Sequence, residues 1–504
     1  MTLAIVYSRA SSGIDAPLVT VEAHLSNGMA GLSIVGLPEK AVKESKDRVR
    51  SVLMNLHFEF PARRITINLA PADLPKEGGR FDLPIALGIL AASGQIPQEI
   101  LMQYEFVGEL ALSGDLRPVR GILPLVMAAT RAGRQLIVPV ANASEAAIFS
   151  HAKVLNAAHI LEVCSHLNNT QTLPICSGVI SASLNEEKLD VAEVKGQPRA
   201  KRALEIAAAG KHSLLLMGPP GTGKTMLASR LPSLLPTLSE DHALEVAAIA
   251  SVSSNGFDAK QWRQIPFRSP HHSTSNVALV GGGRPPRPGE ISLAHHGVLF
   301  LDELPEFSRH VLESLREPLE SGCVTISRAA FQSLFPAQFQ LIAAMNPCPC
   351  GYAGSSQDEC QCSPEHIKRY VSKISGPLLD RIDMHVEVAR LSSTHFLERS
   401  EAEVETSAIV RARVIAAREI QQNRQGVCNA QVAVSLLDTV ASLEKEANAL
   451  LSQVMAKFNL SARSLHRIIK LARTIADLEE SYDVKEVHVS EALQYRCLDR
   501  ARYY

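Results

Sequence analysis

The sequence predicts an α/β fold in which a central domain, built on a parallel sheet, follows an α+β domain and precedes a group of helices. Three observations support this prediction. In the first 166 residues, strands that alternate apolar and polar residues are mixed with helices. From Val191 onward, short apolar runs alternate with helical segments, which is typical of βαβ units. Beyond about Ser393 only helical patterns occur.

Residues 1–166 form the first predicted domain, and residues 167–190 form a predicted linker. The linker segment is polar and contains Pro174 and Gly178, which interrupt regular structure. Within the domain we expect three strands and two long helices, over the following ranges: Val19–Leu25, Arg64–Leu69, Gln135–Val140, Glu39–Leu56 and Leu83–Ala92.

Residues 191–392 are predicted to be the central domain, and residues 393–504 a helical domain that would act as its lid. The central strands are expected at His212–Met217, Gly297–Leu301 and Phe339–Met345. The helices of the last domain are expected over Glu401–Gln422 and Val432–Phe458, with two more opened by Ser461 and Ser490.

Composition excludes several classes of protein. The chain has 504 residues, 46% of them hydrophobic, with 51 basic and 52 acidic residues and a net charge of -1. This supports ordinary globular cores, and any contact with nucleic acid must come from a local patch. No apolar run is long enough to cross a bilayer, and the first nine residues lack the features of a signal peptide. We therefore expect a cytoplasmic protein without a membrane partner.

A glycine-rich segment matches the phosphate-binding pattern G-x-x-x-x-G-K-[ST] at every position: Gly218-Pro219-Pro220-Gly221-Thr222-Gly223-Lys224-Thr225. An apolar strand precedes it and a helix follows it, which a chance glycine-rich turn would not require. The glycines let backbone N–H groups face phosphates, Lys224 supplies a cation and Thr225 offers a hydroxyl to Mg²⁺. The sequence therefore predicts a site for ATP and Mg²⁺.

Hydrolysis also needs carboxylates beside this loop. Asp302 and Glu303 follow the apolar run Gly297–Leu301. We expect Asp302 to hold the metal ion and Glu303 to act as general base. The alternative, a turn that caps a helix, loses weight because Lys224 lies upstream.

Three further polar residues complete the predicted catalytic set. Asn346 ends the next strand and could orient the attacking water, or could be only a turn residue. Arg381 follows an apolar pair and is the candidate arginine finger. Arg463 opens a helix of the lid, from which it would reach across to the bound nucleotide and report its state. For either arginine, a solvated surface position is the alternative.

This ordered series of motifs resembles the AAA+ ATPases, and more closely the magnesium-chelatase-like branch called ComM or YifB. The resemblance covers essentially the whole chain. Besides the phosphate loop, its marks are Phe267-Arg268-Ser269-Pro270-His271-His272-Ser273, Gly281-Gly282-Gly283, Pro288-Gly289-Glu290-Ile291-Ser292-Leu293-Ala294-His295, Asp302-Glu303, Asn346-Pro347-Cys348-Pro349-Cys350-Gly351 and Gly376-Pro377-Leu378-Leu379-Asp380-Arg381.

The resemblance implies a ring, usually a homohexamer, with nucleotides at the subunit interfaces. Arg381 would act on the neighbour's site, and Asn346 and Arg463 would be the two sensors. It also implies an ATP-dependent DNA helicase that drives branch migration when transforming DNA is integrated by homologous recombination. Its expected partners are single-stranded and branched DNA and recombination proteins.

The first domain resembles the Lon protease domain in the runs Phe106–Gly114 and Pro118–Ile122. That family would suggest a serine and lysine peptidase, which needs a lysine base beside a hydroxyl nucleophile. Here Leu123 stands where the lysine would be, and Gly78-Gly79-Arg80-Phe81-Asp82 surrounds the position of the serine. We therefore expect the fold without the activity, in a domain that binds DNA or organises the ring.

Four cysteines lie close together in sequence: Cys348, Cys350, Cys360 and Cys362. Four thiolates suit tetrahedral Zn²⁺, although the single-residue spacing within each pair is tighter than usual. Structural zinc is the leading interpretation, and free thiols and a redox switch remain open.

The segment Ser321–Phe331 alternates apolar and polar residues and predicts a β-hairpin that carries Arg328. In related ring translocases a hairpin here faces the pore, so Arg328 is a candidate phosphate contact, with Arg284 and Arg287 as second choices. Exposed arginines without a partner are an equal alternative.

These features favour an ATP-driven ring motor that moves on DNA. The alternative is a chelatase-like, ATP-dependent remodeller of a protein partner. An ATP-dependent protease is disfavoured by Leu123 and the missing serine.

Overall fold

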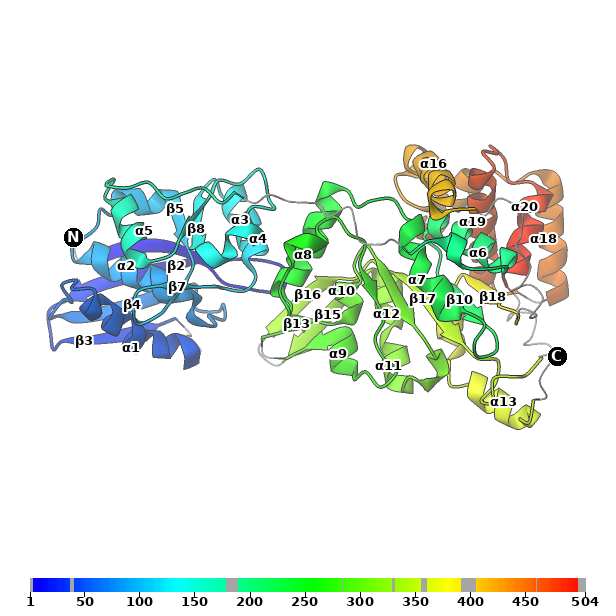
Figure 1. Cartoon of the computed structure of the whole chain (residues 1–504), viewed down its shortest axis with the longest axis horizontal. Helices are drawn as coiled ribbons and strands as arrows, with labels where there is room; N and C mark the ends of the chain where they lie inside the picture. The colour runs from blue at the N-terminus through cyan, green and yellow to red at the C-terminus, as the bar shows by residue number, and fades with distance from the viewer. Residues whose placement is uncertain are drawn as a thin grey trace.

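The computed structural model describes residues 3–36, 40–177, 189–283, 285–328, 331–354, 360–390, 405–458 and 460–496. Three bodies follow one another along the long axis of the molecule (Figure 1). An N-terminal domain occupies one end, a core domain the middle and a helical domain the other end. The predicted fold class, α/β with a parallel core sheet and C-terminal helices, is confirmed.

The N-terminal domain is built on a seven-stranded mixed sheet. Alternating residues of its strand β2 (Leu18–Ser26) are buried, as the apolar and polar alternation requires. In sheet order the strands are β3 (Gly31–Val35), β4 (Arg64–Ala70), β2, β1 (Leu3–Arg9), β5 (Tyr104–Phe106), β8 (Gln135–Pro139) and β9 (Val154–Ala157). The accompanying helices are α1 (Lys40–Asn55), α2 (Asp82–Ala92), α3 (Ile122–Arg131), α4 (Ala143–Ala146) and α5 (Ile160–Leu167).

The core domain carries a five-stranded sheet in which every neighbouring pair is parallel. In sheet order the strands are β11 (Phe267–Arg268), β14 (Val298–Leu301), β17 (Gln340–Met345), β10 (Leu214–Met217) and β18 (Met384–Glu387). β14, β17 and β10 are buried along their whole length because their residues are almost all apolar. Since all strands run the same way, the loops after β10, β14 and β17 meet at one edge.

Shorter elements surround this sheet. The helices are α6 (Pro198–Gly210), α7 (Lys224–Leu234), α8 (Glu240–Val252), α9 (Asn276–Val280), α10 (Glu290–Leu293), α11 (Arg309–Ser314), α12 (Arg316–Ser321), α13 (Pro364–Val371) and α14 (Gly376–Leu379). A hairpin is present, but it extends beyond the predicted range Ser321–Phe331 and consists of β15 (Cys323–Arg328) and β16 (Phe331–Pro336). A second small ribbon pairs β12 (Gly281–Gly282) with β13 (Arg287–Pro288).

The helical domain contains α16 (Ser407–Gln425), α17 (Val434–Ala441), α18 (Lys445–Phe458), α19 (Ala462–Leu478) and α20 (Glu486–Gln494). The helix expected to open at Ser461 is confirmed, since the Ser461 side chain accepts from the Ser464 N–H. The start predicted for α16 at Glu401 lies outside the described residues, and the described helix begins at Ser407.

Two helix predictions in this domain are wrong. The continuous helix predicted over Val432–Phe458 is broken at Ser442, which has φ +39° and whose hydroxyl donates to Asp483 over 2.6 Å. That tertiary contact outweighs the local helical pattern. Ser490 does not open the last helix but lies inside α20, which begins four residues earlier, where the Lys485 N–H donates to Nδ1 of His488 over 3.0 Å.

The structure describes only part of the predicted linker. Ile175 forms a β-bridge with Leu155, so the start of the segment adds to the edge of the N-terminal sheet. Residues 178–188 lie outside the described residues.

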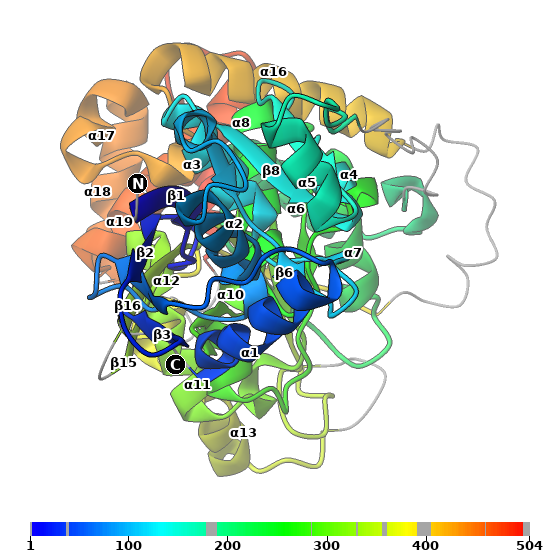
Figure 2. The ribbon, with the colours of Figure 1, turned by 90° about the vertical axis from the view of Figure 1, so that its left-hand side faces the viewer.

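The N-terminal domain contacts the core through α8. Seen along the long axis, the N-terminal domain stands directly in front of the core (Figure 2). Leu123 of α3 is fully buried in a cluster with Ile148, Leu244 and Ala247, the last two from α8. The backbone N–H of Gly121 also donates to the Ser251 carbonyl over 3.1 Å. Leu123 is therefore an interdomain packing residue.

Candidate functional site: the phosphate loop and its surroundings

The predicted phosphate loop connects β10 to α7. Gly221 and Gly223 have φ values of +75° and +85°, a region that side chains with a Cβ rarely adopt. Gly218 is required for another reason, because a Cβ there would lie 2.2 Å from the Val388 carbonyl oxygen. These glycines bring the loop into its turn and let it pass the end of β18.

Lys224 connects the loop to the neighbouring strand. Its Nζ donates to the carbonyl oxygens of Gly218 and Pro219 over 2.7 and 2.8 Å, and to Asn346 Oδ1 over 3.1 Å. Burial lowers the pKa of Lys224, while Asp302 and Glu303 act in the opposite direction. The ammonium group therefore lies among acceptors that a phosphate could replace, and Asn346 lies in the site as expected.

Asp302 faces the first turn of α7. Thr225 Oγ1 donates to Asp302 Oδ2 over 2.6 Å, and the Glu303 N–H donates to Asp302 Oδ1 over 2.9 Å. A hydroxyl and a carboxylate side by side are ligands of the kind that Mg²⁺ prefers beside a nucleotide. The two predicted metal-binding residues are thus brought together.

Glu303 is exposed and has φ +52°, so the chain turns sharply after β14. Its Oε2 lies 3.1 Å from Nδ1 of His272. His272, which is not among the predicted catalytic residues, therefore lies against the candidate base. Its place in the quoted segment Phe267–Ser273 was the signal that could have identified it.

Arg381 lies at the opposite end of the same sheet. β10 and β18 run parallel, with Leu214 opposite Met384 and Met217 opposite Glu387. The phosphate loop follows Met217, whereas Arg381 precedes Met384. Arg381 is therefore separated from its own chain's loop by the length of the strands.

Arg463 lies beside Arg381 and not beside the loop. Both guanidinium groups contact Oε1 of Glu320, with Nη2 distances of 2.5 Å for Arg381 and 3.2 Å for Arg463. The reach of Arg463 to a bound nucleotide stays a prediction, and in this subunit its guanidinium group contacts Glu320.

Comparison with known proteins identifies the family. Three family models match the chain: "Magnesium chelatase, subunit ChlI" over residues 190–396, "Subunit ChlI of Mg-chelatase" over 21–142 and "Magnesium chelatase, subunit ChlI C-terminal" over 404–496. Competence protein ComM of Haemophilus influenzae is 52% identical over 504 residues, which cover 99% of this chain and 98% of that protein. The chain belongs to the ComM/YifB family of magnesium-chelatase-like proteins.

Other relatives agree with this assignment. The protein YifB of Escherichia coli K12 is 49% identical over 99% of this chain and 98% of its own length. The magnesium-chelatase 38 kDa subunit of Cereibacter sphaeroides is 25% identical over 39% of this chain and 57% of its own length. The core sheet with its phosphate loop and the C-terminal helices are consistent with the AAA+ fold of magnesium-chelatase-like proteins. Among the described residues, no helix is long and apolar enough to cross a membrane.

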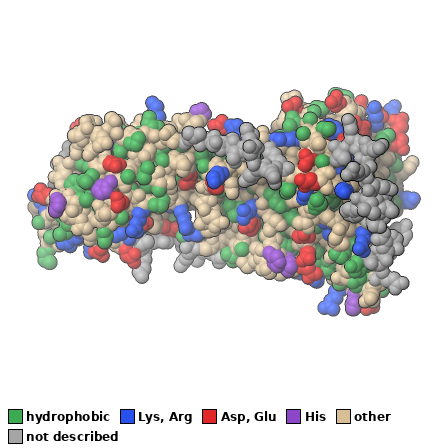
Figure 3. Space-filling model, in the orientation of Figure 1, with side chains coloured by type: hydrophobic (Ala, Val, Ile, Leu, Met, Phe, Trp, Pro, Cys, Tyr) green, Lys and Arg blue, Asp and Glu red, His purple; other side chains and the backbone are tan. Residues whose placement is uncertain are grey.

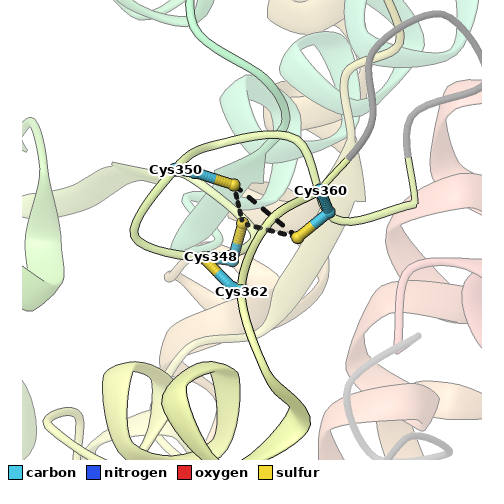
Figure 4. Close-up of side chains that lie close together, drawn as sticks. All are labelled: Cys348, Cys350, Cys360 and Cys362. Carbon is cyan, nitrogen blue, oxygen red and sulfur yellow. Dashed lines mark hydrogen bonds between the residues drawn. The ribbon is translucent and has the colours of Figure 1, made fainter.

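The four clustered cysteines of this ComM/YifB-family chain converge in space (Figure 4). Their Sγ atoms all lie within 4.8 Å of one another, and three of the pairs are 3.3, 3.7 and 3.6 Å apart. A tetrahedral zinc ion with Zn–S bonds of about 2.3 Å would hold its sulfur ligands about 3.8 Å apart. The donor set and its spacing therefore fit Zn²⁺.

The cysteine loop touches the phosphate loop. A Cβ on Gly351 would lie 2.6 Å from Cδ of Pro220. Asn346 is two residues before Cys348, whose sulfur accepts from the Ala353 N–H over 3.3 Å. A metal ion at the cysteines would therefore stiffen a loop that packs on the nucleotide site.

A second group of potential ligands does not fit a metal ion. Nε2 atoms of His295 and His296 lie 3.0 and 2.7 Å from Oε2 of Glu245. However, Nδ1 of His295 accepts from the Gln338 N–H over 3.0 Å, so the proton of a neutral ring lies on Nε2. That nitrogen then donates to Glu245 and has no lone pair for a metal. The group is a hydrogen-bonded link between α8 and the loop that leads into β14.

The candidate DNA contacts are only partly described. Arg284 and the side chain of Arg328 lie outside the described residues, although the Arg328 backbone ends β15 opposite Phe331. Arg287 is half-buried in β13. On the face seen in Figure 3, basic and acidic side chains are mixed, as the net charge of -1 suggests.

Proposed function

We propose that this protein is an ATP-driven, Mg²⁺-dependent ring motor that moves on DNA and migrates branched junctions. The observation that carries the proposal is the division of the ATPase residues between two opposite edges of one sheet. Lys224, Thr225, Asp302 and Glu303 gather at the carboxyl edge, whereas Arg381 lies at the amino edge. A complete site would then need the amino edge of another subunit.

Each residue has a distinct role in this proposal. The loop amides and Lys224 bind the phosphates of ATP, and Thr225 and Asp302 hold Mg²⁺, which neutralises charge on the phosphate oxygens. Glu303 removes a proton from the attacking water, and Asn346 orients that water. Arg381 of a neighbouring subunit stabilises the charge that develops on the transferred phosphoryl group, and Arg463, beside it, acts on the same neighbour. A homohexamer is the ring we propose.

Zinc at the four cysteines is the second cofactor we propose. It would supply a fixed tetrahedral centre without redox chemistry. The cysteines would hold the loop against Pro220 and would keep Asn346 in register with Lys224.

The biological setting comes from the relatives. A competence protein with 52% identity over nearly the full length supports a competence-related role. We propose that this role is the integration of transforming DNA by homologous recombination, in the cytoplasm and alongside recombination proteins. The likeness to magnesium-chelatase subunits favours the second candidate, a chelatase-like, ATP-dependent remodeller of a protein partner.

The test is an assay of ATP turnover and strand movement on labelled three- and four-strand DNA junctions. We expect DNA to stimulate turnover and junctions to be resolved with ATP and Mg²⁺. Lys224→Ala should abolish both activities, whereas Lys260→Ala, an exposed lysine outside the site, should abolish neither. If DNA does not stimulate ATP turnover and the junctions stay intact, the DNA motor is contradicted and the ATP-dependent remodeller of a protein partner is favoured.

A further inference from the structure

A cavity outside the nucleotide site lies between the N-terminal domain and the core. It has a volume of 530 Å³ and is lined by segments that are distant in sequence, including Gly78–Arg80, Pro118–Gly121 and residues Gln332 and Ser333 of β16. The hairpin β15–β16 and β13 occupy the end of the core that faces the first domain (Figure 1). The volume falls in the range of sites that bind small molecules, about 300–1,000 Å³.

Arg80 brings an incompletely paired charge to this cavity. Its Nη2 donates to the Arg120 carbonyl over 3.2 Å, but its buried Nη1 has no hydrogen-bond partner among the described residues. Burial lowers the pKa of Arg80 to about 10, with Glu77 acting in the opposite direction, so the side chain stays charged at neutral pH. A buried cationic donor without an acceptor is unfavourable, and an anion in the cavity would relieve that cost.

Two more arginines line the same space. Arg120 is exposed and Arg287 is half-buried, and neither has an ion pair in the part of the chain that the structure describes. Four polar residues, Ser11, Ser12, Gln332 and Ser333, line the cavity with them.

Three acidic residues, Asp73, Glu77 and Glu109, also line the cavity, but basic groups already act on them. Glu109 Oε1 lies 3.6 Å from Arg117 Nη1. The charge of Asp73 acts to raise the pKa of Lys76, and the charge of Glu77 acts to raise the pKa of Arg80. The acidic residues that line the cavity therefore do not balance the positive charges of Arg120 and Arg287.

We propose that this cavity binds phosphate groups of a single nucleic-acid strand that passes between the N-terminal domain and the hairpin. Arginine, serine and glutamine side chains are the groups that contact phosphates in such complexes. Gln332 pairs across the hairpin with Ser327, whose neighbour in sequence, Arg328, is the candidate phosphate contact predicted from the sequence. The inference rests on the proposed DNA function for the source of the phosphate, and a free phosphate compound is the other source.

The first arm of the test measures binding of a labelled oligothymidine to the full-length protein. ATPγS and Mg²⁺ are kept at saturation, so that the nucleotide site is filled. We expect Arg80→Gln and Arg120→Gln each to weaken binding several-fold. Each should also reduce the slope of log affinity against log salt concentration by about 0.7 for every phosphate that the variant no longer neutralises. Arg131→Gln, an exposed arginine at the end of α3, is the matched control and should leave binding unchanged.

The second arm measures thermal unfolding with pyrophosphate under the same saturation. If the cavity serves a free phosphate compound, pyrophosphate raises the Tm of the parent protein and of Arg131→Gln but not of the two cavity variants. Because Arg120 is exposed, Arg120→Gln keeps the test valid even if Arg80→Gln does not fold. Unchanged oligothymidine affinity and salt slope together with an equal pyrophosphate response in all proteins would overturn the proposal. A parent protein that binds no DNA would overturn both the DNA motor and the nucleic-acid strand as the occupant of the cavity, and the pyrophosphate arm would then decide whether the cavity binds a free phosphate compound.

Discussion

Nη2 of Arg381 lies 2.5 Å from Oε1 of Glu320, at the end of the core sheet opposite the phosphate loop. Arg463 shares the same carboxylate oxygen. Glu320 is the penultimate residue of α12 and lies three residues before β15. In an isolated subunit this carboxylate would hold both arginines, and a neighbour's phosphates would compete for them. The arrangement also ties the two arginines to the base of the hairpin.

The first prediction concerns subunits that share one site. Arg381→Ala should reduce ATP turnover by a factor of about 10³ or more, because an arginine finger stabilises charge that forms only in the transition state. Lys224→Ala should also be inactive. Since the two residues would serve a site from different subunits, a mixture of the two inactive proteins should regain part of the turnover. The measurement is ATP hydrolysis against mixing ratio, with each variant alone as control, and a mixture as inactive as its parts would contradict action between subunits.

The second prediction concerns Glu303 and its contact with His272. Glu303→Gln should lower turnover by about 10²–10⁴-fold, the usual contribution of a general base, while ATP binding is retained through Lys224. His272→Ala should cause a smaller loss, on the order of 10-fold, because a displaced base costs less than a missing one. Turnover and nucleotide affinity are measured separately. Glu306→Gln, an exposed glutamate three residues later that pairs with Lys373, is the control and should leave turnover intact.

Local patterns were sufficient for the central sheet and for its carboxyl edge. β10, β14 and β17 are short apolar runs, and parallel strands place their following residues at one edge, so the meeting of Lys224, Asp302 and Asn346 could be predicted. The contact between Arg463 and Glu320 could not be predicted, because it depends on how α19 packs against the core. The break at Ser442 was missed for a similar reason, since its partner Asp483 is distant in sequence.

The interface role of Leu123 could not be predicted from the sequence either. A leucine in an apolar stretch predicts burial but not its neighbour. Its contacts with Leu244 and Ala247 depend on the docking of a whole domain on α8. Local patterns therefore identify the residues of the candidate ATPase site, whereas the relations between domains depend on the three-dimensional fold.

The third prediction is that the purified protein contains about one zinc ion per chain, as expected for a four-cysteine site. Cys348→Ser and Cys360→Ser should each lose most of the metal and lower the Tm, because metal binding and folding of the loop are coupled. ATP turnover should also fall when the metal is lost, because Gly351 of the cysteine loop packs against Pro220 of the phosphate loop. The measurement is metal analysis by mass spectrometry beside thermal unfolding. Cys323→Ser, outside the cluster, is the control and should keep the metal. A parent protein without zinc would contradict the zinc proposal and leave free thiols or a redox switch as the interpretations of the cluster.

The fourth prediction concerns the contact between the helical domain and the core at Asp383. The Asp383 carboxylate accepts from the Ser213 N–H over 2.9 Å and forms an ion pair with Arg467 of α19. Burial opposes ionisation of Asp383, but the charge of Arg467, the His212 ring, whose Nδ1 lies 3.6 Å from Asp383 Oδ2, and the Ser213 N–H outweigh it and hold the pKa of Asp383 well below its usual range.

The sign of the pH dependence follows from that shift. A depressed carboxyl pKa contributes stability that is present above the unfolded value of about 4 and is lost as pH falls toward the folded value. At neutral pH, Asp383→Asn should lower the free energy of unfolding by about 3–5 kcal/mol, because it leaves the buried partner groups uncompensated. The gap between parent and variant should stay constant down to about pH 4 and shrink below it, as the parent loses the contribution that the variant lacks. Denaturant unfolding across this range is the measurement, with the exposed Asp438→Asn as control. A gap that does not change with acidification would show that Asp383 acts through shape and hydrogen bonding, and that its charge does not hold the helical domain on the core.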